Sequence, residues 1–337
     1  MIGFRVDANE VIATGHLMRC ISIALECKKR GQQCIFFMAE DKETEQLRKA
    51  GFQYYILNSD WKNLDNEISE FQKILENYKL NCLVVDSYQA TAGYLAALEE
   101  IQPVCYIDDL KREVYDVSVV IHYISPYKSS SYEEMYKNTH TQLLNNMKYA
   151  PLRPEFHYKK EKVIREKSIL ITTGGTDFFN VAGKVAALCQ NSMQIKSYKI
   201  HIIVGSMNQY ETELEQLAEK YTNIILHKYI TNMSDYRRLC EVAVSAGGTT
   251  LLELCACKIP TVCFSFADNQ IKFANDMGKI GAVKYVGDAR KIEDIENKIV
   301  KQLLIFIKNE EERKKYADCM GKLIDGYGTE RIADVLC

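Results

Sequence analysis

The chain has 337 residues, 47% of them hydrophobic and 26% charged, which is typical of soluble globular proteins and long enough for two domains. Its net charge of −2 provides no basic surface for nucleic acid, and no apolar run approaches the ~18 residues that span a membrane. The N-terminus lacks a secretion-signal pattern, and the 12 cysteines show no CxxC spacing. We therefore expect a cytoplasmic protein with reduced thiols.

The first half of the chain alternates short apolar runs with helical patterns, which predicts a mostly parallel sheet covered by helices on both faces. The expected strands are 2–7, 34–38, 54–57, 82–85, 104–107 and 117–121, and the expected helices are 15–30, 42–50, 64–78 and 91–100. Ligands of such sheets bind at the carboxyl ends of the strands. The chain has Asp7, Asp86-Ser87-Tyr88 and Asp108-Asp109 at such ends, the last pair interpreted as a turn or helix cap. Tyr88 stands out because a hydroxyl on a strand-end loop can position a water or a sugar hydroxyl.

The stretch from Ala13 to Arg19 places His16 in the first turn of a predicted helix, directly after the first strand. Free N–H groups and the positive end of the helix dipole lie there, so the position favours a neutral imidazole. A neutral imidazole suits a general base. A helix cap or a solvated side chain is the alternative for a lone histidine.

A break follows in the middle of the chain, where Pro151 and Pro154 precede a charged stretch at 158–167 that indicates a linker. The alternation then restarts, with strands expected at 168–173, 200–204, 224–226, 242–245 and 261–264. Helices are expected at 180–190, 209–220, 291–307, 309–324 and 328–336, with one ending near 257 and one starting at 268. We expect domains at 1–152 and 167–325, with the helix of residues 326–337 packing back across the linker.

Two glycine pairs each lie between a strand and a helix of this second half, in Gly174-Gly175-Thr176-Asp177 and Gly247-Gly248-Thr249. Glycine allows close backbone approach and a helix N-terminus presents free N–H groups, which together suit a diphosphate. Glu253 lies about one turn into the second helix, where a carboxylate can accept hydrogen bonds from the two ribose hydroxyls. Alone, Glu253 would fit a capping or surface role equally well.

The order of elements from 228 to 275 resembles the nucleotide-sugar half of GT-B glycosyltransferases, above all the N-acetylglucosaminyltransferase of peptidoglycan lipid synthesis. The matching positions are Tyr229-Ile230, Met233, Gly247-Gly248-Thr249, Glu253, Pro260 and Asp268-Asn269-Gln270. The resemblance implies two Rossmann-like α/β domains that face each other across a cleft. It places uracil near Ile230, ribose at Glu253, and the sugar near Asn269 and Gln270.

Further motifs narrow the resemblance: Arg5-Val6-Asp7, Gly15-His16-x-x-Arg19, Asp86-Ser87-Tyr88 and Gly174-Gly175-Thr176-Asp177. Together they resemble the UDP-2,4-diacetamido-2,4,6-trideoxy-β-L-altropyranose hydrolases of pseudaminic-acid biosynthesis, over nearly the whole chain. That family hydrolyses the anomeric C1–O bond of a UDP-sugar with inversion and without metal or cofactor. It implies His16 as the base for water and Tyr88 near the reacting centre.

The same resemblance gives the neighbours of His16 a role. Arg5, Asp7, Gly15 and Arg19 are expected to orient His16 or to contact N-acetyl groups of the sugar, and a structural ion pair is the alternative for the charged ones. One departure is Ala13, where the family often has glycine.

Other activities fit the same predicted site. A glycosyltransferase would need an acceptor, and a hydrolysing UDP-sugar 2-epimerase would take up solvent deuterium at C2. A non-enzymatic nucleotide-sugar-binding protein would leave His16 as a passive cap. We expect a monomer whose partner is a UDP-sugar.

Overall fold

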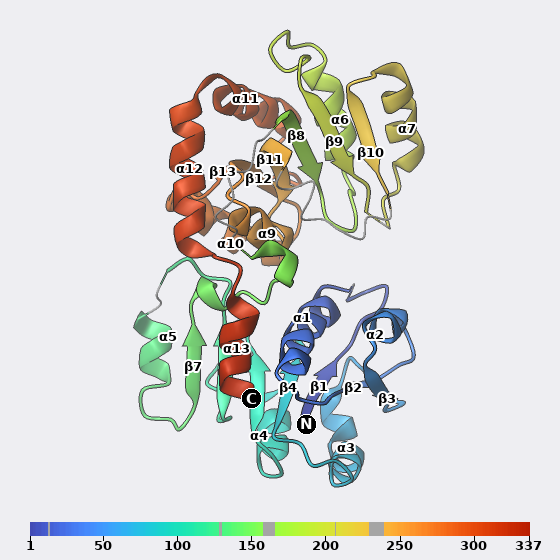
Figure 1. The fold of residues 1–337 in the computed structure, drawn as a ribbon, viewed down its shortest axis with the longest axis vertical. Coiled ribbons are helices and arrows are strands. Elements are labelled where there is room, and N and C mark those ends of the chain that lie inside the picture. The colour runs from blue at the N-terminus through green and yellow to red at the C-terminus, as the bar shows by residue number, and fades with distance from the viewer. Residues whose placement is uncertain (13, 128–129, 158–165, 206, 229–238) are drawn as a thin grey trace. The chain divides into compact units, whose positions relative to one another are not determined.

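The computed structural model describes residues 1–12, 14–127, 130–157, 166–205, 207–228 and 239–337, without the side chains of 130 and 131. These residues form two compact units (Figure 1). The first comprises residues 1–154 together with 326–337, and the second comprises residues 155–325. Ala13, Ile230 and Met233 lie outside the described residues.

The first unit is built on a parallel sheet that, within the described residues, has seven strands in the order β3-β2-β1-β4-β5-β6-β7. Its strands are β1 (Ile2–Val6), β2 (Cys34–Met38), β3 (Gln53–Ile56), β4 (Cys82–Asp86), β5 (Val104–Ile107), β6 (Val119–His122) and β7 (Gln142–Asn145). Its helices are α1 (Gly15–Lys29), α2 (Glu45–Ala50), α3 (Ile68–Leu75), α4 (Ala92–Glu99), α5 (Ser130–Met135) and α13 (Gly328–Leu336), with 3-10 turns η1 (Leu64–Glu67) and η2 (Met147–Tyr149). Every residue of β1 and β4 is buried, as expected for strands covered on both faces.

The order of strands in this sheet reverses between β1 and β4. The chain adds strands outward from β1 to β3, then returns to place β4 beside β1 and continues to β7. Val6 of β1 lies opposite Asp86 of β4, so the loops that follow these two strands meet at one edge. Open parallel sheets bind ligands at such a reversal.

The second unit repeats this plan with a parallel sheet that, in its described part, has the order β10-β9-β8-β11-β12-β13. Its strands are β8 (Glu166–Thr172), β9 (Lys199–Ile203), β10 (Ile224–His227), β11 (Cys240–Ala246), β12 (Thr261–Ser265) and β13 (Lys284–Asp288). Its helices are α6 (Val181–Cys189), α7 (Glu211–Lys220), α9 (Thr250–Ala256), α10 (Asp268–Lys279), α11 (Ile295–Lys308) and α12 (Glu310–Leu323), and the 3-10 turn η3 (Pro154–Phe156) lies where the units join in the chain. The reversal falls between β8 and β11, which are the strands that precede the two glycine pairs.

Helix α13 belongs to the first unit, although it follows the second unit in the sequence. It packs against α1 and η2 (Figure 1). The Thr329 hydroxyl donates to the Leu152 carbonyl at 3.4 Å. A Cβ on Gly328 would lie 2.0 Å from the Ala150 carbonyl oxygen, so this close approach requires glycine.

Among the described α-helices and β-strands, three are absent from the sequence-based expectations: β7, β13 and α5. Each is short, and their sequences explain why the patterns miss them. β7 begins with the exposed Gln142, and β13 contains Gly287 at a φ of 116°. Among the described residues, no helix has both the length and the apolar content needed to cross a membrane.

Candidate active site

His16 lies in the first turn of α1, which begins at Gly15 after the loop that follows β1. Asn9 organises this loop, because its side-chain oxygen accepts the amides of Val11 and Ile12 at 2.9 Å. The His16 side chain is 12% exposed. The first turn of α1 therefore holds the imidazole at the reversal of the sheet with one edge still open to solvent.

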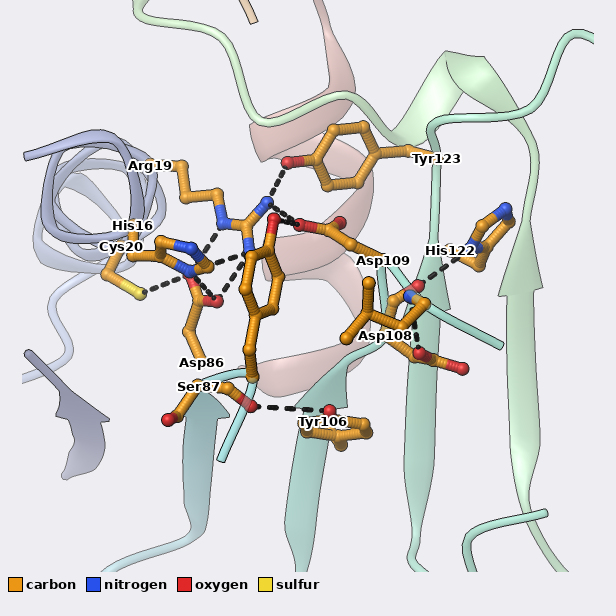
Figure 2. A network of polar contacts seen from close by, with 12 residues as sticks. His16, Arg19, Cys20, Asp86, Ser87, Tyr106, Asp108, Asp109, His122 and Tyr123 are labelled. Atoms are coloured by element: carbon orange, nitrogen blue, oxygen red, sulfur yellow. Dashed lines mark hydrogen bonds and ion pairs between the residues drawn. The ribbon is translucent and has the colours of Figure 1, made fainter. Parts of the chain in front are cut away.

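The imidazole of His16 contacts Asp86, the last residue of β4 (Figure 2). Nδ1 lies 2.6 Å from the Asp86 Oδ1 atom. Arg19 Nη2 also lies 3.0 Å from Nδ1, and both nitrogens share Asp86 Oδ1 as their acceptor. Since a carboxylate accepts, we assign the proton to Nδ1, and Nε2 of the neutral ring then presents a lone pair.

The charge of Asp86 is stabilised by its neighbours. Burial by itself raises the pKa of this carboxyl, but the Arg19 charge and the hydrogen bonds from Arg19 and His16 outweigh burial and hold the pKa well below its usual range. Asp86 therefore stays ionised at neutral pH and can orient the imidazole.

Arg19, one turn after His16 on α1, joins Asp86 to a second carboxylate (Figure 2). Its Nε and Nη2 donate to the two oxygens of Asp86, each at 2.5 Å. Its Nη1 donates to Asp109 Oδ2 at 2.8 Å and to the Tyr123 hydroxyl. Burial disfavours the charged guanidinium, but Asp109 and Asp86 raise the pKa of Arg19 well above its usual value, so Arg19 is a fixed cation.

Tyr88 completes the cluster around His16. The two rings meet edge to face, with centroids 4.6 Å apart and planes at 83°. The Tyr88 hydroxyl donates to Asp109 Oδ2 at 3.1 Å. Burial and the Asp109 charge raise the pKa of Tyr88, so the phenol stays protonated at neutral pH. The structure thus brings His16, Arg19 and Tyr88 together.

Sequence analysis misses the roles of Asp86 and Asp109 in this cluster. Asp108 does cap a turn, because its Oδ1 accepts the amides of Leu110 and Lys111 at 2.9 and 2.8 Å. Asp109 instead bonds Arg19 and Tyr88. The available signal is positional, since both acids end or closely follow buried strands near the reversal of the sheet.

Arg5 and Asp7 belong to a separate buried network. Arg5 is fully buried and donates to both oxygens of Glu67, at 2.6 and 3.0 Å, and to Asp7 at 2.6 Å. The other oxygen of Asp7 accepts the Ala39 amide at 2.7 Å. This placement favours the structural ion pair over a sugar contact or an effect on His16.

In the second unit, the loop after β8 uses glycine for close packing. Gly174 has a φ of 85°, which glycine adopts without strain. The Gly175 carbonyl accepts the Met207 amide at 3.0 Å, and a Cβ on Gly205 would lie 2.3 Å from the Gly174 oxygen. The loops after β8 and β9 therefore lie in backbone contact. Gly174 and Gly175 are exposed, and their contact with a diphosphate stays a prediction.

Asp177 caps helix α6. Its two oxygens accept the amides of Val181 and Ala182 at 2.8 and 2.9 Å, and Asn180 accepts the Gly183 amide at 3.2 Å. The Asp177 residue is only 4% exposed. These amides are already paired, so the geometry favours a capping role for Asp177 over the predicted substrate contact. Thr176 is half-buried, and its contact with substrate stays a prediction.

Thr173 separates β8 from Gly174 and carries an unusual hydroxyl. The residue is 2% exposed, and its Oγ1 atom has no hydrogen-bond partner among the residues that the structure describes. Buried hydroxyls are normally paired. An orphan at the reversal of this sheet indicates a place where a ligand or a water supplies the partner.

The second glycine pair follows β11. A Cβ on Gly247 would lie 2.9 Å from the Ala274 Cβ of α10, whereas one on Gly248 would meet no atom of the described residues within 4 Å. Thr249 is exposed and makes no capping hydrogen bond at the start of α9, and Glu253 is half-buried in the first turn. The Gly248 side of this loop is therefore open.

The two predicted sugar contacts lie at the start of α10. Gln270 accepts the Phe266 amide at 3.1 Å through its side-chain oxygen, which holds the loop after β12. Asn269 is exposed. Their contact with a sugar stays a prediction, and the predicted uracil site at Ile230 is outside the described residues.

Comparison with known proteins identifies the architecture. Residues 168–323 match the family model of the glycosyltransferase family 28 C-terminal domain. The whole chain is similar to the crystal structure of MurG from Acinetobacter baumannii, with a TM-score of 0.65 and 12% identity, over 99% of this chain and 98% of that one. The chain has the GT-B fold. The predicted fold class is thus confirmed.

Three relatives of known sequence also match the chain, one over nearly its full length and two over part of their own. The chain is 21% identical to the spore coat polysaccharide biosynthesis protein SpsG of Bacillus subtilis, over 99% of this chain and 97% of that protein. It is 26% identical to the uncharacterized protein MJ1062 of Methanocaldococcus jannaschii, over 77% of this chain but 54% of that protein, so it spans about half that relative's length.

The third relative is the UDP-N-acetylglucosamine–N-acetylmuramyl-(pentapeptide) pyrophosphoryl-undecaprenol N-acetylglucosamine transferase of Thermosipho africanus. The identity is 29%, over 42% of this chain and 41% of that protein.

Proposed function

We propose that this protein is an inverting enzyme that displaces UDP from the anomeric carbon of a UDP-sugar, with His16 as general base. The single observation that carries the proposal is the 2.6 Å contact between His16 Nδ1 and Asp86 at the reversal of the first sheet. It fixes the ring with Nε2 as the acceptor. In Ser-His-Asp enzymes a buried carboxylate has the same two effects on the histidine, orienting the ring and stabilising the imidazolium.

The chemical step follows from this arrangement. The O–H of the nucleophile donates to Nε2, its oxygen forms a bond to C1, and its proton passes to Nε2. The C1–O bond to the diphosphate breaks, and UDP leaves with the bonding electrons. A single displacement inverts the configuration at C1. Asp86 stabilises the imidazolium that results.

In this proposal the second unit holds the UDP. Support comes from the family-model match over 168–323, the open loop at Gly248, and the orphan hydroxyl of Thr173. Backbone amides of the two glycine loops would bind the diphosphate, and Glu253 would accept the ribose hydroxyls. Stabilising the charge of the departing diphosphate accelerates its loss.

The proposal includes two candidate reactions, which differ in the nucleophile that attacks C1. Transfer to an acceptor hydroxyl comes first, because the matching family model describes glycosyltransferases and the relative from Thermosipho africanus is named as one. Hydrolysis of a UDP-diacetamido-trideoxyhexose comes second. A specific observation favours it: His16 and Tyr88, the pair implied by the resemblance to such hydrolases, are in ring contact.

Substitution of the base and its partner tests the proposal. His16→Asn removes the base, so kcat for UDP release should fall by at least about 10²-fold. Asp86→Asn should cost about 10²- to 10⁴-fold, because the ring loses its tautomer and orientation. The affinity for UDP, measured by calorimetry, should stay within about twofold because the nucleotide loops belong to the second unit.

His140 provides a matched control, since it forms an exposed pair with Asp116 at 3.0 Å. His140→Asn should leave kcat unchanged. Full turnover in His16→Asn would refute the base assignment. Release of UDP should be measured with UDP-N-acetylglucosamine and a UDP-diacetamido-trideoxyhexose, each with and without acceptor sugars. Release that requires an acceptor identifies a transferase, and release without one identifies a hydrolase.

A further inference from the structure

The hydroxyl of Tyr88 has one proton, which it donates in a hydrogen bond to Asp109. Tyr88 donates to Asp109 Oδ2 at 3.1 Å, and the same oxygen accepts from Arg19 Nη1 at 2.8 Å. A hydrogen bond to an ionised carboxylate is stronger than one to a neutral group. What the Tyr88 oxygen offers to any other partner is therefore a lone pair.

The proton on His16 Nδ1 is likewise held in a hydrogen bond to an acid. Its Nδ1–H donates to Asp86, so its Nε2 also offers a lone pair. Arg19 holds both carboxylates, with two hydrogen bonds to Asp86 and one to Asp109. One buried guanidinium thus fixes two acids, and each acid fixes the proton of one ring. The two rings are in edge-to-face contact.

We propose that Asp109 and Arg19 are positioning residues that make Tyr88 a hydrogen-bond acceptor for the nucleophile deprotonated by His16. This inference rests on the proposed function. Two acceptors on rings that are in contact match water, which has two O–H groups, better than an alcohol, which has one. Water donates one O–H to each ring, its lone pair attacks C1, and the proton on the His16 side passes to Nε2. The inference therefore favours hydrolysis over transfer.

Substitution of Asp109 gives a direct test. Arg19 and Tyr88 share Asp109 Oδ2, so in Asp109→Asn either a neutral oxygen or an NH₂ group takes that place. A neutral oxygen holds the phenolic proton more weakly, and an NH₂ group donates to the Tyr88 oxygen and turns that proton outward. We expect kcat to fall by about 10- to 100-fold, as for loss of one hydrogen bond in the transition state. KM and the UDP dissociation constant should be unchanged. Tyr88→Phe should lose a similar factor.

The double variant separates positioning from a merely structural role. If Asp109 acts through Tyr88, the pair Tyr88→Phe with Asp109→Asn should be no slower than Tyr88→Phe alone. Losses that multiply in the double variant would overturn the proposal, as would normal kcat in Asp109→Asn.

Arg19→Lys tests the role of Arg19 in holding both acids. An ammonium group cannot reproduce the two hydrogen bonds to Asp86 together with the third to Asp109. We therefore expect kcat to fall while the affinity for UDP is retained.

Asp108 is the matched control. It is the acid next to Asp109 in the sequence, but its side chain accepts backbone amides of the following turn. Asp108→Asn should keep kcat. If the wild type releases UDP and His16→Asn does not, while Asp109→Asn and Tyr88→Phe are normal, the positioning proposal fails and the proposed function stands. If the wild type releases UDP from no UDP-sugar, with or without acceptors, both fail.

Discussion

Two networks of buried charged residues in the first unit have similar chemistry but differ in where they end. Arg5, Asp7 and Glu67 saturate one another and a backbone amide, so their network closes within the protein. Arg19 and Asp86 also pair, but their network ends on the ring of His16. Burial of unpaired charge is costly, and every acid in the two networks forms an ion pair with Arg5 or Arg19. Only the second presents atoms suited to react with a ligand.

The orphan hydroxyl of Thr173 leads to a prediction at this scale. Thr173→Val removes a buried hydroxyl that has no partner among the described residues, so the free energy of unfolding should not fall. If the hydroxyl bonds the nucleotide, UDP should bind about 5- to 10-fold more weakly, corresponding to about 1 kcal/mol. Calorimetry with UDP and thermal unfolding measure the two effects.

Ser245 is the control for this experiment. It is the last residue but one of the neighbouring strand β11, is also buried, and donates to the Ala246 carbonyl at 2.9 Å. Ser245→Ala should therefore lower stability and leave the affinity for UDP unchanged. Unaltered UDP binding in Thr173→Val would exclude the hydroxyl from the nucleotide site.

Sequence reasoning at the residue scale finds the candidate site residues more readily than the partners that hold them. His16 and Tyr88 are identified by local position, at a helix start and a strand end. Their partners are distant in sequence, since His16 and Asp86 are 70 residues apart and Arg19 and Asp109 are 90 apart. Such contacts depend on strand order in the sheet, which local patterns do not determine.

At the scale of elements, buried parallel strands are well predicted because both faces are covered and their sequences are continuously apolar. Strands 34–38 and 104–107 have the predicted bounds. β7 and β13 are missed because they mix polar residues, or a glycine, into short runs at the edges of their sheets. Helix caps are also hard to distinguish from ligand contacts, as Asp177 shows, because both use carboxylates beside free amides.

The hydrogen bond between His122 at the end of β6 and Asp108 after β5 makes the stability of the first unit depend on pH. His122, the last residue of β6, lies with Nδ1 2.6 Å from the Asp108 carbonyl oxygen, to which it donates. The residue is 3% exposed. Burial, and then the Lys111 charge, lower the pKa of His122 to about 4. The folded chain therefore keeps this ring neutral at a pH where the unfolded chain protonates it.

The sign follows from proton binding. Between about pH 4 and 6.5 the unfolded state binds more protons at His122, so stability is lost as pH falls through this window. We expect His122 to contribute a loss of about 2 kcal/mol in unfolding free energy from pH 7 to pH 5. His122→Asn, whose amide can still donate to the carbonyl, should show a correspondingly smaller loss in denaturant titrations. Equal losses in both proteins would contradict the assignment.

At the scale of the whole molecule, the two units share one plan, in which a parallel sheet reverses its strand order beside the loops that carry the candidate site residues. The first unit presents His16 and Asp86 at its reversal, and the second presents Thr173 and the two glycine pairs. If the first unit supplies the general base and the second binds UDP, substitutions of the candidate site residues in the first unit should lower kcat. Those in the second unit should lower the affinity for UDP.

The most direct test of the account follows the bridging oxygen between C1 and the diphosphate. A UDP-sugar labelled with ¹⁸O at that position is incubated with the protein, with and without acceptors, and the released UDP is analysed by mass spectrometry. Attack at C1 predicts that the label stays in UDP and that the product has the inverted anomeric configuration, with release suppressed at least about 10²-fold in His16→Asn. Label in the sugar product, or equal release by His16→Asn, would contradict the account.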